Sequence, residues 1–179
     1  RHRRLQGQTT MSLFPGDIEE LAQRIIADFT ARGFMVSTAE SCTGGLIAGS
    51  LTEIAGSSAV VDRGFVTYTN QAKIDMLGVG AETLTTFGAV SRQTALQMAH
   101  GALFRSRADF AVAVTGIAGP GGGSPDKPVG LVHLAAKARS GKILHHEMRY
   151  GEIGRTEIRL ATVRTALEML VALSQVGSA

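Results

Sequence analysis

Residues 36–46, VSTAESCTGGL, pass from a short strand-like run through a polar step into a run with helical spacing. This order predicts a strand that turns into a helix, with the hydroxyl of Ser41 at the apex of the turn. A Ser or Thr in this place can accept hydrogen bonds from the first helical amides, so capping is the simplest interpretation of Ser41 and Thr43. The same amides favour a phosphate or a developing oxyanion. Because Glu40 and Cys42 add polar groups that one cap does not need, a reactive role for Ser41 is the alternative.

Strand-like and helix-like segments alternate outward from this stretch. We expect helices over residues 17–32, 46–54, 70–77, 91–107 and 155–173, and strands over 34–38, 59–68, 109–114, 129–138 and 142–150. Asp17 is placed to cap the first helix and Gly33 to end it, a bend is expected at 62–64, and a polar loop is expected before Ser91, which caps the next helix.

The order of these segments defines the fold class. Residues 109–114 form an uninterrupted apolar run, typical of a strand that is buried on both faces. The last two strands are joined at 139–141 as a hairpin, which makes them antiparallel. We therefore predict an α/β fold: a single-domain three-layer sandwich with a mixed, mostly parallel sheet flanked by helices.

Composition limits the classes of function. The chain has 179 residues and is 44% hydrophobic, which suits one core. Residues 1–10 carry three arginines and no acid; we expect a leader that is disordered or arises from expression or start-site choice, followed by one domain over 11–179. Without those arginines the chain has fifteen basic and fifteen acidic residues, which argues against direct nucleic-acid binding.

The single cysteine and the hydropathy pattern indicate the environment. Cys42 has no partner for an internal disulfide, and zinc sites of several thiolates are excluded. Residues 1–10 lack the apolar core of a signal peptide, and no run of eighteen apolar residues exists. We expect a soluble, cytoplasmic protein without a membrane partner.

A second loop is rich in glycine. Residues 115–125, TGIAGPGGGSP, follow the apolar strand at 109–114 but match neither a Walker A motif nor a dinucleotide-binding fingerprint. One interpretation is a flexible surface loop. The other is a rim of backbone amides that holds a phosphate or carboxylate, to which Thr115 adds a hydroxyl.

Lys73 is the candidate base. An exposed surface lysine is the simpler interpretation. If Lys73 instead lies partly buried beside Ser41, desolvation lowers its pKa and the neutral amine can accept the hydroxyl proton. Cys42, one position past the apex, is expected to be a buried thiol rather than a nucleophile. The five histidines show no spacing typical of a metal site, and His145 and His146 alternate across a strand.

Four motifs in one order resemble the C-terminal domain family of the competence-damage-inducible protein CinA. They are residues 39–45 (AESCTGG), 64–68 (GFVTY) with Lys73, 88–91 (GAVS) and 115–122 (TGIAGPGG). The resemblance extends from Asp17 to Leu173. It implies nicotinamide-nucleotide amidase activity, in which nicotinamide mononucleotide is hydrolysed to nicotinic acid mononucleotide and ammonia during pyridine-nucleotide recycling.

The resemblance and the chemistry together assign roles to residues. Ser41 is the expected nucleophile, Lys73 the general base, and Tyr68 a proton relay or substrate contact. The amides of Thr43, Gly44 and Gly45 are a hypothesis for the oxyanion site. The residues expected to hold the phosphate or ribose are Thr115, Gly116, Gly119, Gly121 and Gly122, with Arg92 as a weaker candidate. No metal and no organic cofactor is expected.

Two other functions stay open at this point. One is a nucleotide-binding regulatory module, linked to competence or DNA damage, without useful catalysis. The other is an amidase that acts on a different small carboxamide. The small residues of helix 91–107, together with the closing helix, also suggest a homo-oligomer.

Overall fold

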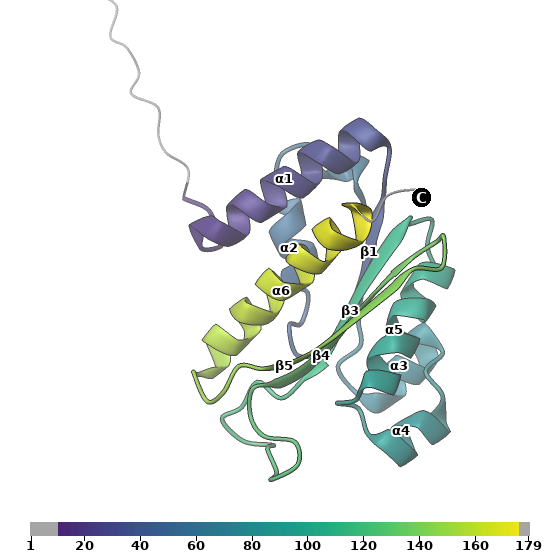
Figure 1. The fold of residues 1–179 in the computed structure, drawn as a ribbon, viewed down its shortest axis with the longest axis vertical. Coiled ribbons are helices and arrows are strands. Elements are labelled where there is room, and N and C mark those ends of the chain that lie inside the picture. Colours follow the sequence, from purple (N-terminus) through teal and green to yellow (C-terminus); the bar gives the residue numbers. More distant parts are fainter. Residues whose placement is uncertain (1–10, 176–179) are drawn as a thin grey trace, which may run out of the picture.

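Five strands form one mixed sheet in the computed structural model, which describes residues 11–175 (Figure 1). The strands are β1 (Val36–Glu40), β2 (Val61–Val66), β3 (Phe110–Gly116), β4 (Leu131–Ala138) and β5 (Ile143–Arg149). Their order is β2-β1-β3-β4-β5, and only β4 runs against the other four. The predicted mixed, mostly parallel sheet is confirmed. The expected leader lies outside the described residues.

Helices cover both faces of the sheet. The helices are α1 (Gly16–Arg32), α2 (Leu46–Thr52), α3 (Asn70–Leu77), α4 (Ala81–Phe87), α5 (Arg92–Phe104) and α6 (Arg155–Gln175), with a 3-10 turn η1 (Ser57–Ala59). Figure 1 shows α1, α2 and α6 on one face, and α5 with α3 and α4 on the other. This is the three-layer α/β sandwich that the alternating segments predict. Within residues 11–175, no helix combines the length and apolar character needed to cross a membrane.

The core on the α1 and α6 side contains an aromatic cluster. The rings of Phe29, Phe34 and Phe110 lie 5.1–5.9 Å apart between their centroids. Burying a side chain of this size contributes roughly 1.5–3 kcal/mol. Gly33 ends α1 in the left-handed conformation, with φ of 71°, as predicted.

The start of α1 differs from the prediction. The N-cap residue is Pro15, and no side chain caps the helix. Asp17 lies in the first turn and instead pairs with Arg164 of α6, whose hydrogen bond lowers the pKa of the Asp17 carboxyl. The aspartate therefore ties α1 to α6, a contact that no local pattern indicates.

The core on the other face is built from small side chains. Ala95, Ala99 and Ala102 of α5 are buried against alanines of the sheet, such as Ala111. Gly101 lies so close to α3 that an added Cβ would meet a carbonyl oxygen of that helix at 2.0 Å. The small-residue face of α5 is thus occupied within the chain, so it gives no support to the expected homo-oligomer.

Three further differences have local causes. Residues 81–87, expected in a polar loop, form α4, of which only Leu84 is buried, so its apolar periodicity is weak. Strand β1 continues to Glu40 because both neighbouring strands pair with it that far. The bend expected at 62–64 is a β-bulge at Asp62, where the register against β1 shifts by one residue while β2 continues.

Candidate active site

Three parallel strands end side by side and place the predicted residues together. Ser41 follows β1, Lys73 lies on α3 after β2, and Thr115 lies near the end of β3. These segments enclose an open pocket of about 280 Å³. It is lined by Ser41, Cys42, Tyr68, Lys73, Ala89, Val90, Thr115, Gly116, Ile117, Ala118, Gly119, Gly121, Gly122 and Arg155. The carboxyl ends of parallel strands are where α/β folds bind ligands.

Lys73 is buried beside Ser41. Lys73 is only 1% exposed, and its Nζ lies 3.0 Å from Ser41 Oγ. Nζ also donates to the backbone carbonyls of Thr67, at 2.9 Å, and Tyr68, at 3.3 Å. Burial lowers the pKa of Lys73 from its usual value of 10.5.

This geometry suits a neutral amine. A neutral lysine has two N–H groups, which match the two carbonyl acceptors, and one lone pair, which is then left for the Ser41 hydroxyl. No salt bridge of Lys73 occurs within the described chain. The sequence left two interpretations of Lys73, an exposed side chain or one buried beside Ser41. The structure shows the buried one.

Glu40 caps α2, whereas Ser41 and Thr43, the predicted capping residues, do not. Its side chain is fully buried, and its oxygens accept from the amides of Ile47, at 2.8 Å, and Ala48, at 3.1 Å. The hydroxyl of Thr43 donates to the same carboxylate at 2.7 Å. Ser41 is therefore not a capping residue, and its hydroxyl is left to Lys73 (Nζ to Oγ 3.0 Å).

The three residues proposed for the oxyanion site do not line the pocket. The Gly44 amide donates to the Ser41 carbonyl at 3.0 Å, so it is engaged inside the turn. Gly44 and Gly45 have φ of 56° and 104°, a conformation that favours glycine. With Thr43 bonded to Glu40, these residues shape the turn, and their oxyanion role stays a prediction.

The five residues predicted in the glycine-rich loop all line the pocket, but three have structural roles. Thr115 Oγ1 donates to the Ala89 carbonyl at 2.8 Å. An added Cβ on Gly116 would lie 2.6 Å from the Val132 side chain. An added Cβ on Gly119 would also lie 2.6 Å from the Val129 side chain, and the Gly119 carbonyl accepts from Arg155. Gly121 and Gly122 remain available to a ligand, and the space around a Cβ at Gly121 is open.

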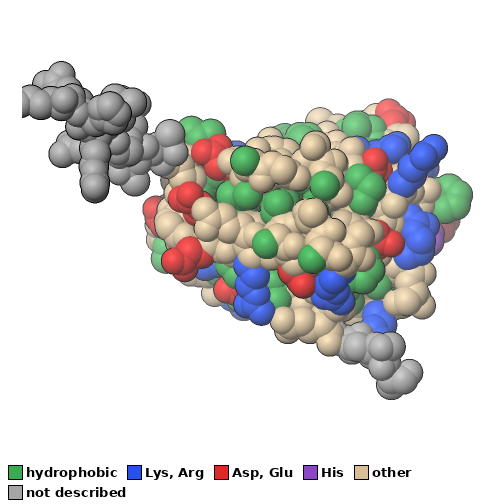
Figure 2. All heavy atoms as spheres, turned by 90° about the horizontal axis from the view of Figure 1, so that it is seen from above, with side chains coloured by type: hydrophobic (Ala, Val, Ile, Leu, Met, Phe, Trp, Pro, Cys, Tyr) green, Lys and Arg blue, Asp and Glu red, His purple; other side chains and the backbone are tan. Residues whose placement is uncertain are grey.

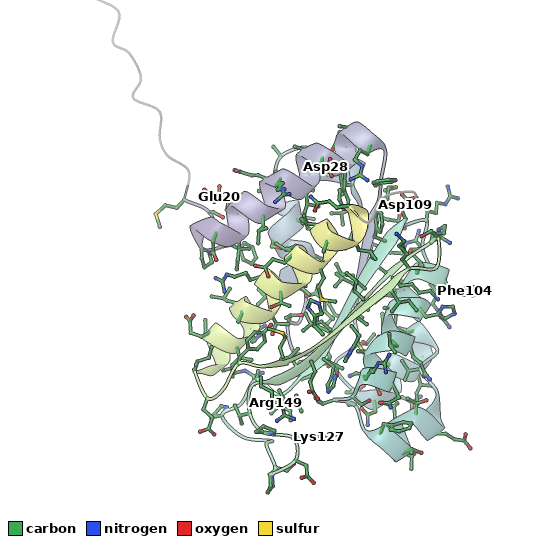
Figure 3. All side chains as sticks on the ribbon, viewed as in Figure 1. Glu20, Asp28, Phe104, Asp109, Lys127 and Arg149 are labelled. Atoms are coloured by element: carbon green, nitrogen blue, oxygen red, sulfur yellow. The ribbon has the colours of Figure 1, made fainter. Side chains whose placement is uncertain are left out.

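The glycine-rich loop is held at its C-terminal end by Lys127, which Figure 3 labels near Arg149. Lys127 Nζ donates to the carbonyl of Phe87 at the end of α4, at 2.6 Å. Residues 120–126 are all exposed, so the stretch is a surface loop, as one of the two interpretations expected, and Lys127 anchors it at its end.

Arg92 does not line the pocket. It lies near His145 on β5, whose pKa is lowered by burial and then by the Arg92 charge. His145 is 2.9 Å from His133, ring nitrogen to ring nitrogen. Across residues 11–175, no three His, Cys, Asp or Glu side chains form a group that could hold a metal ion.

Cys42 is buried, 5% exposed, as expected from its place past the apex. Burial raises the pKa of its thiol to about 12. A thiol that stays protonated at neutral pH is a poor nucleophile, so Ser41 stays the predicted nucleophile of the turn.

Sequence reasoning missed two arginines on α6. Arg155 donates through Nη1 to the Gly119 carbonyl, at 2.7 Å, and through Nη2 to the Tyr68 hydroxyl, at 3.0 Å. Arg159, one turn later, donates to the carbonyls of Cys42, at 3.0 Å, and Thr43, at 3.2 Å, and so holds the turn that carries Ser41. The available signal was two arginines spaced i, i+4 near the start of a helix, where the dipole disfavours cations.

Comparison with known sequences identifies relatives of the chain. A family model described as the CinA C-terminal domain matches residues 18–174. A protein of Escherichia coli strain K12 named nicotinamide-nucleotide amidohydrolase PncC is 48% identical over 155 residues, which cover 86% of this chain and 93% of that protein. A protein of the same name from Enterobacter agglomerans is 46% identical over 157 residues, covering 86% and 96%.

Solved structures agree with this placement. The competence/damage inducible protein CihA of Agrobacterium tumefaciens is 88% identical, with a TM-score of 0.92 over 92% of this chain and 100% of that one. The competence damage-inducible protein A of Klebsiella pneumoniae is 37% identical, with a TM-score of 0.84 over 89% and 99%.

Proposed function

Because the chain belongs to the CinA C-terminal domain family, we propose that it is an amidase that hydrolyses nicotinamide mononucleotide to nicotinic acid mononucleotide and ammonia. The names of the Escherichia coli and Enterobacter agglomerans relatives support the activity. The observation that carries the mechanism is the 3.0 Å contact between buried Lys73 Nζ and Ser41 Oγ.

Acylation begins with Ser41. Its Oγ attacks the carboxamide carbon while Lys73 accepts the hydroxyl proton, which gives a tetrahedral intermediate with an oxyanion. Collapse of the intermediate breaks the C–N bond. Lys73 returns the proton to the leaving nitrogen, so ammonia departs and an acyl ester remains on Ser41.

Deacylation uses the same groups. Water gives a proton to Lys73 and attacks the ester carbon, and the proton returns to Ser41 Oγ as the carboxylic acid leaves. The two carbonyls that accept from Nζ keep the amine aimed at Oγ through both steps. The cycle needs neither a metal nor an organic cofactor, and we place it in the cytoplasm.

Tyr68 fits the role of substrate contact better than that of proton relay. It is 59% exposed, lines the pocket, and its hydroxyl oxygen accepts from Arg155. The phenolic proton is therefore free to be donated to a ligand, whereas the proton path between Ser41 and Lys73 is direct.

The test is ammonia release from nicotinamide mononucleotide by purified protein in the presence of a metal chelator, run beside Ser41→Ala. We expect release by the parent and none by the variant, while the variant still binds the nucleotide. Equal rates in both proteins would exclude Ser41 as the nucleophile. Binding without release by the parent would favour the regulatory module, and release from a carboxamide lacking phosphate would favour an amidase of different substrate range.

Direct binding of nucleic acid is not part of this proposal. The face shown in Figure 2 carries acidic and basic side chains interspersed, not the continuous basic surface that phosphate backbones require.

A further inference from the structure

A buried carboxylate lies directly before the nucleophile turn, residues 41–45. Within residues 11–175, Glu40 is the only acidic residue that is buried, and it is 0% exposed. It is the last residue of β1, so Ser41 follows it in the chain. Glu40 forms no salt bridge in this part of the chain. Because removing a carboxylate from water costs free energy, other groups must stabilise this charge.

Four hydrogen-bond donors meet the two oxygens of the Glu40 carboxylate. Oε1 accepts from the Thr43 hydroxyl at 2.7 Å and from the Ile47 amide at 2.8 Å. Oε2 accepts from the Ala48 amide at 3.1 Å and, in a longer contact of 3.3 Å, from the Thr38 hydroxyl. A carboxylate only accepts hydrogen bonds, so donors on both oxygens match its chemistry and stabilise the buried charge.

We propose that Glu40 is a positioning residue of the amidase reaction, which holds the nucleophile turn so that Ser41 Oγ stays within hydrogen-bond distance of Lys73 Nζ. This inference rests on the proposed amidase function. Glu40 does not line the pocket, so it acts through Ser41 and not by contact with the substrate.

Capping of α2 does not by itself account for a buried glutamate. A helix is ordinarily capped by a short Ser, Thr, Asn or Asp side chain directly before its first turn. Glu40 instead accepts from amides that lie seven and eight residues further along the chain, on the far side of the nucleophile turn. Its side chain therefore ties the residue before the turn to Thr43 within it and to α2 after it.

The backbone of Glu40 contacts the residue that orients the base. Its carbonyl accepts from the Thr67 amide at 2.8 Å, and the Thr67 carbonyl accepts from Lys73 Nζ at 2.9 Å. The Ser41 amide donates to the Val114 carbonyl of β3 at 3.1 Å. The backbone on both sides of Glu40 is thus fixed to the neighbouring strands, and its side chain fixes the turn that follows.

The test replaces Glu40 by glutamine, which has nearly the same shape but carries an NH2 group in place of one oxygen. A threonine hydroxyl can turn to accept from that group, but a backbone amide cannot, so one α2 amide loses its acceptor. We expect kcat for nicotinamide mononucleotide to fall about 10- to 100-fold, as for a misplaced reacting group, while KM stays close to the parental value.

Ser50→Ala is the matched control. Ser50 is 1% exposed and donates to the Ile47 carbonyl at 2.7 Å, so its loss weakens the same helix without touching the Glu40 carboxylate or the pocket. The control should keep the parental kcat and KM at a temperature at which circular dichroism shows every variant to be folded. A parental kcat for Glu40→Gln, or a rise in KM alone, would overturn the proposal.

A second pair of variants keeps the carboxylate and changes one donor. Thr43→Val removes the hydroxyl that donates to Glu40, so kcat should fall by a smaller factor than in Glu40→Gln, and Thr43→Ser should restore most of it. This pair decides the matter if Glu40→Gln does not fold, because a parental kcat for Thr43→Val would then overturn the proposal.

Chemical labelling of Ser41 separates this inference from the amidase function. In the reaction with a fluorophosphonate, an Oγ–P bond forms, the P–F bond breaks, fluoride leaves and Lys73 takes the proton. Mass spectrometry measures the labelling rate of the parent and of Glu40→Gln. Slower labelling of the variant supports the positioning role even if the parent releases no ammonia.

The opposite results are also distinct. Ammonia release by the parent, together with equal kcat and equal labelling in Glu40→Gln, would refute the positioning role and leave the amidase function standing. A parent that neither releases ammonia nor is labelled at Ser41 would overturn both.

Discussion

The two basic side chains of the pocket differ in burial, and this separates their chemistry. Lys73 is 1% exposed, and burial lowers its pKa, so it can lose its proton and act as a base. Arg155 is exposed, and its guanidinium donates to the Gly119 carbonyl and the Tyr68 hydroxyl at the rim of the pocket. The two basic side chains of one pocket therefore lie in different surroundings, one desolvated and one open to solvent.

The largest expected effect on activity comes from replacing the buried lysine, Lys73, with arginine. Lys73→Arg keeps the positive charge but cannot accept a proton near neutral pH. We expect kcat/KM for ammonia release to fall about a hundredfold to ten-thousandfold, the usual contribution of a general base. Lys137→Arg, at a lysine that contacts His100 outside the pocket, should retain parental activity. An active Lys73→Arg enzyme would transfer the role of base to Tyr68 or to water.

The pH dependence of the reaction should differ from the pH dependence of ligand binding. Lys73 must be neutral to act, so kcat/KM should rise about tenfold per pH unit below its lowered pKa and level off before 10.5. A rate that keeps rising to pH 10.5 would show an unperturbed lysine. Binding of the nucleotide to Ser41→Ala should not follow this profile, since binding needs no proton transfer to Lys73.

The same group makes stability depend on pH. The unfolded chain holds the Lys73 proton up to 10.5, whereas burial lowers the pKa in the folded protein, so the unfolded state binds more protons between the two values. Stability should therefore increase with pH across that window. Urea unfolding should show this increase for the parent and a smaller one for Lys73→Met.

The smallest effect is expected at Cys42, which lies beside Ser41 but takes no part in the chemistry. Cys42→Ala should leave kcat/KM close to the parental value and cost about 1 kcal/mol of stability through lost packing. Because burial raises the thiol pKa to about 12, iodoacetamide at pH 8 should alkylate the unfolded protein and spare the folded one. Rapid alkylation of the folded protein with loss of activity would place the thiol in the site.

The elements with strong local signals were predictable. The helix end at Gly33 and the cap at Ser91 follow from the backbone preferences of single residues, and both occur. The apolar run that became β3 was recognisable because both faces of that strand are buried. Helix α4 was not predicted, because it buries only one apolar side chain and its sequence therefore shows almost no apolar periodicity.

The residues of the site likewise divide into those that the sequence indicated and those that it did not. Ser41, Lys73 and the glycine-rich loop stand out in the sequence, because reactive and flexible residue types follow strands that end at one edge of a sheet. Arg155 and Arg159 lie more than a hundred residues from Ser41, where an arginine on a helix is indistinguishable from a solvated one.

By itself, the sequence determined the α/β class and the chemical types at the strand ends, since periodicity and turn chemistry are local properties of the chain. Only the tertiary structure decided which residue caps α2, whether Lys73 is buried, and which groups Arg155 contacts. Glu40 rather than Ser41 caps α2, Lys73 is buried, and Arg155 has no carboxylate. Desolvation and counter-charge depend on which distant segments surround a group, and packing alone sets that.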